Sequence, residues 1–182
     1  ILDGSAAPPV PGTMRTRGFE APPAAARRDA RRRGIDVIVP VYLGYDETVA
    51  CIESLLKTID GGTDVIVIDD ASPDLRLSAA LRDFEKSGSI TLLRNDSNEG
   101  FAASVNRGLA IHEHRDAVLL NSDAAVHGNW LERLRAAAYS APNIATATPL
   151  TNNGSIASYA RDDSETDRSD GAAALDSMAA AV

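Results

Sequence analysis

The chain has 182 residues, of which 44% are hydrophobic and 24% charged, so it can bury the core of one domain and wholesale disorder is excluded. Its formal net charge of −8 excludes the basic overall field that is typical of nucleic-acid-binding proteins. The single cysteine, Cys51, excludes an intrachain disulfide and a multi-cysteine metal site, and it fits a reducing compartment.

Residues 1–34 are rich in proline, alanine and arginine, with seven arginines against three acidic residues. This composition predicts a linker or disordered arm, and the alternative is a short basic helix that contacts an anionic partner. The segment lacks the positive and then apolar pattern of a signal peptide. Because the first residue is Ile1 and not methionine, we expect the chain to be part of a longer protein.

Five short apolar runs alternate with segments of helical periodicity from residue 35 onwards. Such runs predict strands that are buried on both faces, and the alternation predicts an α/β fold. We expect a Rossmann-like parallel sheet with right-handed crossovers and helices on both faces. Asp46, Asp74 and Asn129 are the expected helix N-caps. The expected strands are 35–41, 65–68, 90–93, 117–120 and 144–148.

Acidic and amide side chains follow two of these strands directly. Asp69 and Asp70 follow the second strand, and Asn121, Ser122 and Asp123 follow the fourth. Ligands of open parallel sheets bind at the carboxyl ends of the strands, where clustered carboxylates repel unless a cation or hydrogen-bond donors separate them. Carboxylates in this position suit Mg²⁺ or Mn²⁺ together with substrate phosphates. Turn formation and helix capping remain the alternative interpretations.

Several other residues have simpler interpretations. Gly100 is expected to open a helix whose N-terminus could face a phosphate, whereas Gly108 is more typical of close packing between a helix and a sheet. His112 and His114 indicate a helix C-terminus rather than a metal pair, and Cys51 is expected in the core. The first strand is not followed by G-x-G-x-x-G and the sequence has no P-loop, which argues against a dinucleotide-binding Rossmann domain.

Four stretches, in order along the chain, resemble the motifs of family 2 glycosyltransferases. The stretch VIVPVY at 37–42 resembles the opening strand, and VIVIDDASPD at 65–74 resembles the second strand with its D-D-x-S-x-D turn. NEGFA at 98–102, followed by Asn106 and Gly108, is similar to the N-x-G-F-A…N-x-G element. LLNSD at 119–123 resembles the D-x-D-like metal motif. Within the family, the four stretches most resemble the motifs of rhamnosyltransferase-like members.

The resemblance implies a GT-A fold and transfer of a sugar, with inversion, from a nucleotide diphosphate donor. By position, it implies five donor-nucleotide-binding residues and one metal ligand. Asp70 would contact the base or ribose, and the metal, Mg²⁺ or Mn²⁺, would bridge the diphosphate. Leu43 stands where the family usually has asparagine. The implied nucleotide-binding residues are Pro40, Tyr42, Asp70, Asn121 and Ser122, and the implied metal ligand is Asp123.

The resemblance covers residues 35–160, which it implies to be a nucleotide-diphospho-sugar-binding domain. Residues 161–182 are acidic and then alanine-rich, and we interpret them as a tail or the start of a truncated acceptor half. The catalytic base would belong to that acceptor half, so no catalytic residue is assigned. The catalytic domain in this chain is therefore expected to be incomplete.

The implied partners are a nucleotide diphosphate sugar donor and a glycan or lipid-linked acceptor, as in polysaccharide biosynthesis, with no nucleic acid. No apolar run reaches the roughly 20 residues of a membrane span, so we expect no transmembrane segment in this chain. The expected location is cytoplasmic, with any membrane association coming from parts of a longer protein. The alternative function is a non-catalytic nucleotide-binding or interaction module. A phospho-receiver domain fits less well, because its acidic pair should follow the first strand.

Overall fold

The computed structural model describes residues 34–149. The predicted arm, apart from Gly34, and the predicted acidic tail lie outside the described residues.

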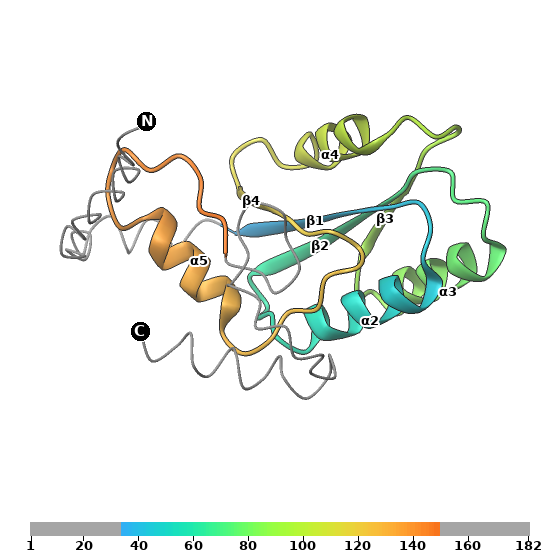
Figure 1. The fold of residues 1–182 in the computed structure, drawn as a ribbon, viewed down its shortest axis with the longest axis horizontal. Helices are drawn as coiled ribbons and strands as arrows, with labels where there is room; N and C mark the ends of the chain where they lie inside the picture. The colour runs from blue at the N-terminus through green and yellow to red at the C-terminus, as the bar shows by residue number, and fades with distance from the viewer. Residues whose placement is uncertain (1–33, 150–182) are drawn as a thin grey trace, which may run out of the picture.

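The described residues form one parallel sheet of four strands in the order β3-β2-β1-β4 (Figure 1). The strands are β1 (Ile35–Val41), β2 (Thr63–Asp69), β3 (Thr91–Arg94) and β4 (Asp116–Leu119). The central strands β1 and β2 pair along their full lengths, and their apolar runs leave almost no side chain exposed. The predicted parallel α/β sheet is therefore confirmed.

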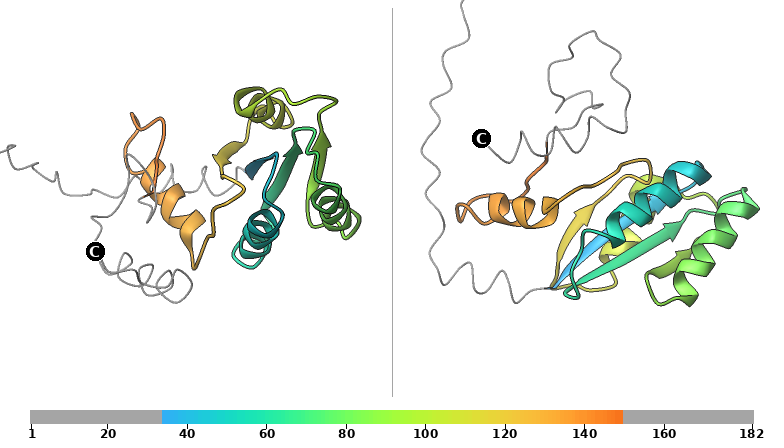
Figure 2. Two further views of the ribbon diagram at one scale, coloured as in Figure 1. Left: turned by 45° about the vertical axis from the view of Figure 1, so that its right-hand side comes forward. Right: turned by 90° about the horizontal axis from the view of Figure 1, so that it is seen from below.

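Helices cover both faces of this sheet, as predicted. Helices α2 (Tyr45–Leu56) and α3 (Leu75–Lys86) lie on one face, and α4 (Phe101–Leu109) lies on the other (Figure 1). Helix α5 (Trp130–Ala138) follows β4 and contributes Trp130 and Leu131 to the core on the α2 side. Figure 2 shows α2 and α3 side by side beneath the strands. The crossovers thus leave the carboxyl ends of all four strands at one edge.

The core is thick on the α2–α3 face and thin on the α4 face. Valines of β1 and β2 pack against Ile52, Leu55 and further apolar residues of α2 and α3. On the other face, Ile38 and Ile68 meet α4 at Gly108, where an added Cβ would lie 2.7 Å from Ile38 Cγ2 and 3.0 Å from Ile68 Cδ1. Gly108 therefore allows close helix–sheet packing, as the sequence predicted.

Three local predictions differ from the structure. Residues 144–148 form no strand, and Ile144 is 37% exposed. Alanine alternates with threonine there, and one isoleucine offers too little apolar surface to hold a strand against the sheet edge. Asp46 is not an N-cap, because Gly44, with φ +91°, takes that position and Asp46 falls in the first turn of α2. Helix α4 ends at Leu109, so His112 lies beyond it.

The other two predicted caps take their expected positions. Asp74 caps α3, where its side chain accepts hydrogen bonds from Arg76 N at 2.8 Å and Leu77 N at 3.3 Å. Asn129 occupies the N-cap position of α5 without a side-chain hydrogen bond. A capping side chain of this kind stabilises a helix by about 1 kcal/mol, so α3 has the better defined start.

Candidate functional site

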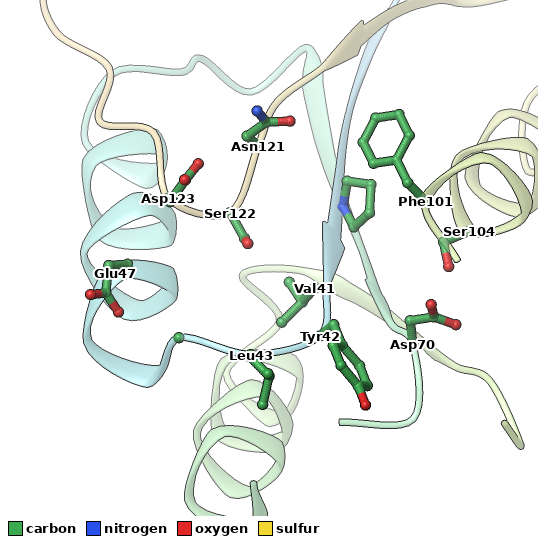
Figure 3. Close-up of a pocket in the computed structure, with 12 residues that line it drawn as sticks. Val41, Tyr42, Leu43, Glu47, Asp70, Phe101, Ser104, Asn121, Ser122 and Asp123 are labelled. Atoms are coloured by element: carbon green, nitrogen blue, oxygen red, sulfur yellow. The ribbon is translucent and has the colours of Figure 1, made fainter. Parts of the chain in front are cut away.

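A pocket of about 570 Å³ lies at the carboxyl end of β1 (Figure 3). The chain order switches direction here, because β2 lies on one side of β1 and β4 on the other. Open α/β sheets bind their ligands at such a switch point. The structure brings all six sequence-predicted site residues to this pocket, and their individual roles stay predictions. They are Pro40, Tyr42, Asp70, Asn121, Ser122 and Asp123.

Sequence reasoning missed six further residues that line the pocket. Phe101 and Ser104 could have been predicted from the sequence. Phe101 belongs to the NEGFA stretch, and Ser104 follows it one helical turn later. Glu47 had no distinguishing signal, since an acidic residue in the first turn of a helix is ordinary. The six are Val41, Leu43, Gly44, Glu47, Phe101 and Ser104.

On the β2 side of the pocket, the carboxylate of Asp70 is held by a dense set of donors. Its Oδ1 accepts hydrogen bonds from Asn95 Nδ2 at 2.6 Å and Glu99 N at 2.9 Å, and its Oδ2 accepts one from Gly100 N at 2.8 Å. Burial acts to raise the pKa of Asp70, but bonds from Glu99 N, Asn95, Gly100 N and Ser104 outweigh it and lower the pKa. Asp70 is therefore ionised and anchors the loop that leads into α4.

The adjacent Asp69 faces the interior and has a different task. Its carboxylate accepts hydrogen bonds from Ser72 N at 2.7 Å and Ser78 Oγ at 3.1 Å, and it forms an ion pair with Arg94. The chain turns directly after the two aspartates, at Ala71, which has a left-handed φ of +55°. Asp69 thus holds the turn after β2, and only Asp70 reaches the pocket.

Two aromatic rings stand at the pocket with much of their surface free. Tyr42 is 41% exposed and Phe101 is 56% exposed, whereas Pro40 is half-buried in β1. Figure 3 shows Tyr42 beyond the end of β1 and Phe101 on the α4 side, near Ser104. Exposed rings beside a polar pocket offer flat surfaces on which a planar base can stack.

On the β4 side, the pocket is lined by oxygen atoms. Asn121, Ser122 and Asp123 come from the segment after β4, and Glu47 comes from the first turn of α2 (Figure 3). A carboxylate, a hydroxyl and an amide in one open pocket are the donor set that a hard divalent cation prefers. The residues present therefore fit Mg²⁺ or Mn²⁺ by their chemistry.

The electrostatics of the pocket are one-sided. Three carboxylates, those of Glu47, Asp70 and Asp123, line it, and the twelve lining residues include no lysine, arginine or histidine. The charge of Asp70 is balanced by hydrogen-bond donors, whereas Glu47 and Asp123 are exposed. A polyanionic ligand would be repelled from that side unless a cation came with it.

Cys51 lies beneath the β4 side of the pocket. It is buried in α2, and its thiol donates to the backbone oxygen of Asn121 at 3.5 Å. Burial and the negative charge of Asp123 raise the pKa of Cys51 to about 11, so the thiol stays protonated at neutral pH. The prediction that Cys51 is a core residue is confirmed.

A second polar cluster lies at the opposite, amino-terminal edge of the sheet. Ligand atoms of Asp36, Asp64 and His112 lie within 4.8 Å of one another, a spacing that could hold a metal ion. However, Arg115 pairs with both carboxylates, with its Nε 3.0 Å from Asp36 Oδ1, which is close enough for an ion pair but not aligned as a hydrogen bond. His112 Nδ1 lies 2.9 Å from Asp36 Oδ2. His112 thus joins the helix end to β1, and the predicted role as a helix C-cap is wrong.

The fold and the pocket together define a parallel α/β protein with a pocket at a topological switch point of its sheet. The family model of glycosyl transferase family 2 matches residues 36–176. This match covers most of the chain, and the chain belongs to that family.

Two curated relatives match over 100 residues, or 55% of this chain. It is 26% identical to the glycosyltransferase GlyG of Streptococcus pneumoniae serotype 4 and 27% identical to the uncharacterized glycosyltransferase YibD of Escherichia coli K12. The matched regions span 33% and 29% of those proteins, so the chain matches about a third of each relative's length.

A solved structure supports the fold. The structure of GalNAc-T7 with UDP, GalNAc and Mn²⁺ superposes with a TM-score of 0.52 at 20% identity, covering 59% of this chain and 21% of that one. The GT-A type of sheet expected from the resemblance agrees with this likeness. Within residues 34–149, no helix has the length and apolar character that crossing a membrane requires.

Proposed function

We propose that this chain is the donor-binding part of an inverting glycosyltransferase that transfers a sugar from a nucleotide diphosphate sugar to an acceptor hydroxyl. The observation that carries the proposal is the pocket at the switch point, lined by three carboxylates and no basic side chain. A negatively charged pocket accommodates a diphosphate only together with a divalent cation. Membership of glycosyl transferase family 2 supports the same conclusion.

In this proposal, each side of the pocket contacts a different part of the donor molecule. Tyr42 and Pro40 bind the nucleobase by apolar contact, and Asp70 accepts a hydrogen bond from the base or ribose in addition to those it accepts within the protein. Asn121 and Ser122 approach the ribose from the β4 side. Both sides lie within one pocket that suits the size of such a ligand.

Asp123 is the proposed metal ligand, with Mg²⁺ or Mn²⁺ as the ion. When bound, the ion neutralises charge that develops on the departing nucleoside diphosphate. GalNAc-T7, which shares the fold, was solved with UDP and Mn²⁺. The acceptor is proposed to be a hydroxyl of a glycan or lipid-linked sugar, and no catalytic base is assigned. A cytoplasmic location is part of this proposal, and the single buried cysteine fits such a reducing compartment.

Calorimetric titration tests the proposal directly. The chain is titrated with UDP-, GDP- and dTDP-sugars, each with and without Mn²⁺. We expect at least one donor to bind only, or far more tightly, when the metal is present. The proposal would be refuted if no donor bound, or if Mn²⁺ left the affinity for every donor unchanged.

The second candidate is a non-catalytic nucleotide-binding or interaction module. It is favoured by the short matched region, which is about a third of each curated relative. Sustained transfer or hydrolysis of the bound donor by the chain would exclude this candidate. Donor binding with no turnover would favour it over the catalytic proposal.

A further inference from the structure

The segment that carries Asp123 has no regular structure of its own. Residues 120–129 follow β4 as turns and irregular chain before α5 begins at Trp130. Backbone hydrogen bonds hold it at Leu120 N, which donates to Ile38 O at 3.0 Å, and at Ala124 N, which donates to Asn121 O at 3.1 Å. Figure 1 shows this segment running alongside α2 on its way to α5.

Side chains of α2 and of the turn after it hold the segment and the start of α5 at three further points. Cys51 Sγ donates to Asn121 O at 3.5 Å, and Ser54 Oγ accepts from Val126 N at 3.1 Å. Just beyond the end of α2, Thr58 Oγ1 accepts from the indole Nε1 of Trp130 at 3.0 Å. Cys51 and Ser54, three residues apart, lie on one face of α2, and Thr58 follows four residues later in the turn after the helix.

The two hydroxyls are oriented for this task by α2 itself. Ser54 Oγ donates its hydrogen to Cys51 O at 2.8 Å, and Thr58 Oγ1 donates to the backbone oxygens of Ser54 or Leu55 at 3.0 and 3.1 Å. Each hydrogen is therefore committed to the helix, and each oxygen presents a lone pair to the neighbouring segment. The contacts flank Asp123, one before it and two after it in sequence.

We propose that Cys51, Ser54 and Thr58 are positioning residues, which fix the segment carrying Asp123 relative to α2 and thereby set the affinity for the divalent cation. The inference rests on the proposed function, because Asp123 is the metal ligand there. The same helix carries Glu47 into the pocket, so α2 joins both exposed carboxylates of the metal side to one rigid element. Residues that orient a ligand in this way tune metal affinity without touching the metal.

The sharpest test is Ser54→Ala, with Ser87→Ala as its matched control. Ser87 Oγ donates to Phe84 O at 2.7 Å, three residues back, just as Ser54 Oγ does to Cys51 O, but Ser87 is exposed and reaches only Ser89 besides. We expect Ser54→Ala to weaken Mn²⁺ binding about fivefold in the presence of whichever nucleotide the wild type binds, UDP, GDP or dTDP, the size expected for one lost hydrogen bond. Ser87→Ala should leave Mn²⁺ affinity unchanged.

Three readouts separate positioning from general destabilisation. Metal-independent nucleotide affinity should be unchanged in Ser54→Ala, and amide hydrogen exchange should accelerate over residues 121–129 but not in β1 or β2. Thr58→Val should shift the fluorescence of Trp130, the single tryptophan, whereas Thr58→Ser keeps the hydroxyl and should restore the wild-type spectrum.

The outcomes distinguish this inference from the proposed function. Wild-type protein that binds no Mn²⁺ in the presence of UDP, GDP or dTDP overturns both. Wild-type binding that Ser54→Ala leaves unaltered, with unaltered exchange at 121–129, overturns only the positioning role. Equal losses of metal and nucleotide affinity would show a structural role alone, and would also overturn it.

Discussion

The two sides of the pocket are built by different means. On the β2–α4 side, Asp70 is buried and receives hydrogen bonds from two backbone amides and the side chain of Asn95. On the β4–α2 side, Asp123 is exposed, and its segment is tied to α2 mainly through side chains of that helix. Donors within the protein surround the carboxylate of Asp70, whereas the carboxylate of Asp123 is exposed and open to a ligand. In the proposed function, the preorganised β2–α4 side would bind the base or ribose, and a cation would complete the β4–α2 side.

The difference between the two sides of the pocket is tested with the largest expected effect at Asp123. We expect Asp123→Ala to abolish metal-dependent nucleotide binding, with a loss of at least about 100-fold in affinity if the carboxylate is a direct metal ligand. Because the side chain is exposed, the free energy of unfolding should change by less than about 0.5 kcal/mol. Calorimetry with Mn²⁺ and urea unfolding measure the two quantities. A variant that keeps full metal dependence would contradict the difference drawn between the two sides.

Asp70→Asn should differ from Asp123→Ala in having a large effect on stability. An asparagine presents one oxygen in place of two, so at least one donor among Asn95, Glu99 N and Gly100 N loses its acceptor. The expected loss is about 2–3 kcal/mol of unfolding free energy, the size of a hydrogen bond to a buried charge. Asp96→Asn, at an exposed carboxylate in the loop after β3 that Asp70 anchors, is the control and should cost less than about 0.5 kcal/mol. Equal urea midpoints for the two variants would refute the assigned role.

The rigidity of the β2–α4 side also depends on the close approach of α4. Gly108→Ala places a Cβ against Ile38 and Ile68, so overpacking should cost about 1–3 kcal/mol of unfolding free energy. Gly61→Ala is the matched control, because nothing lies within 4 Å of its added Cβ. Thermal or urea unfolding compares the two. If Gly108→Ala were as stable as Gly61→Ala, the tight packing of α4 would be disproved.

The smallest expected effect is the pH dependence that Asp70 contributes. Its pKa is lower in the folded protein than in the unfolded chain, so its contribution to stability is present above the unfolded pKa of about 4. That contribution is lost as pH falls through the folded pKa. Urea unfolding between pH 6 and pH 3 should therefore show a steeper decline for wild-type protein than for Asp70→Asn. Parallel curves would show that the ionised form of Asp70 is not favoured by folding.

Local patterns in the sequence determined much of this protein. The apolar runs predicted a parallel sheet of strands buried on both faces, because strands covered on both faces need no polar side. This burial is found in the central strands β1 and β2, whereas the edge strands β3 and β4 are only partly buried. The position of Asp70 and of Asn121–Asp123 directly after such runs predicted that they meet at one edge, since parallel strands share their carboxyl ends. Asp74 as a cap and Gly108 as a packing glycine were predictable for the same local reason.

The tertiary structure decided what depends on partners far along the chain. Asp69 and Asp70 are alike in sequence, and only packing against Arg94 and Asn95, 25 residues away in each case, assigns one to the interior and the other to the pocket. The run at 144–148 had the composition of a weak strand, but no pairing formed to stabilise it. The bond between Ser54 and Val126 spans 72 residues. Local periodicity reports which face of an element is buried, whereas the choice of partner depends on how the whole chain packs.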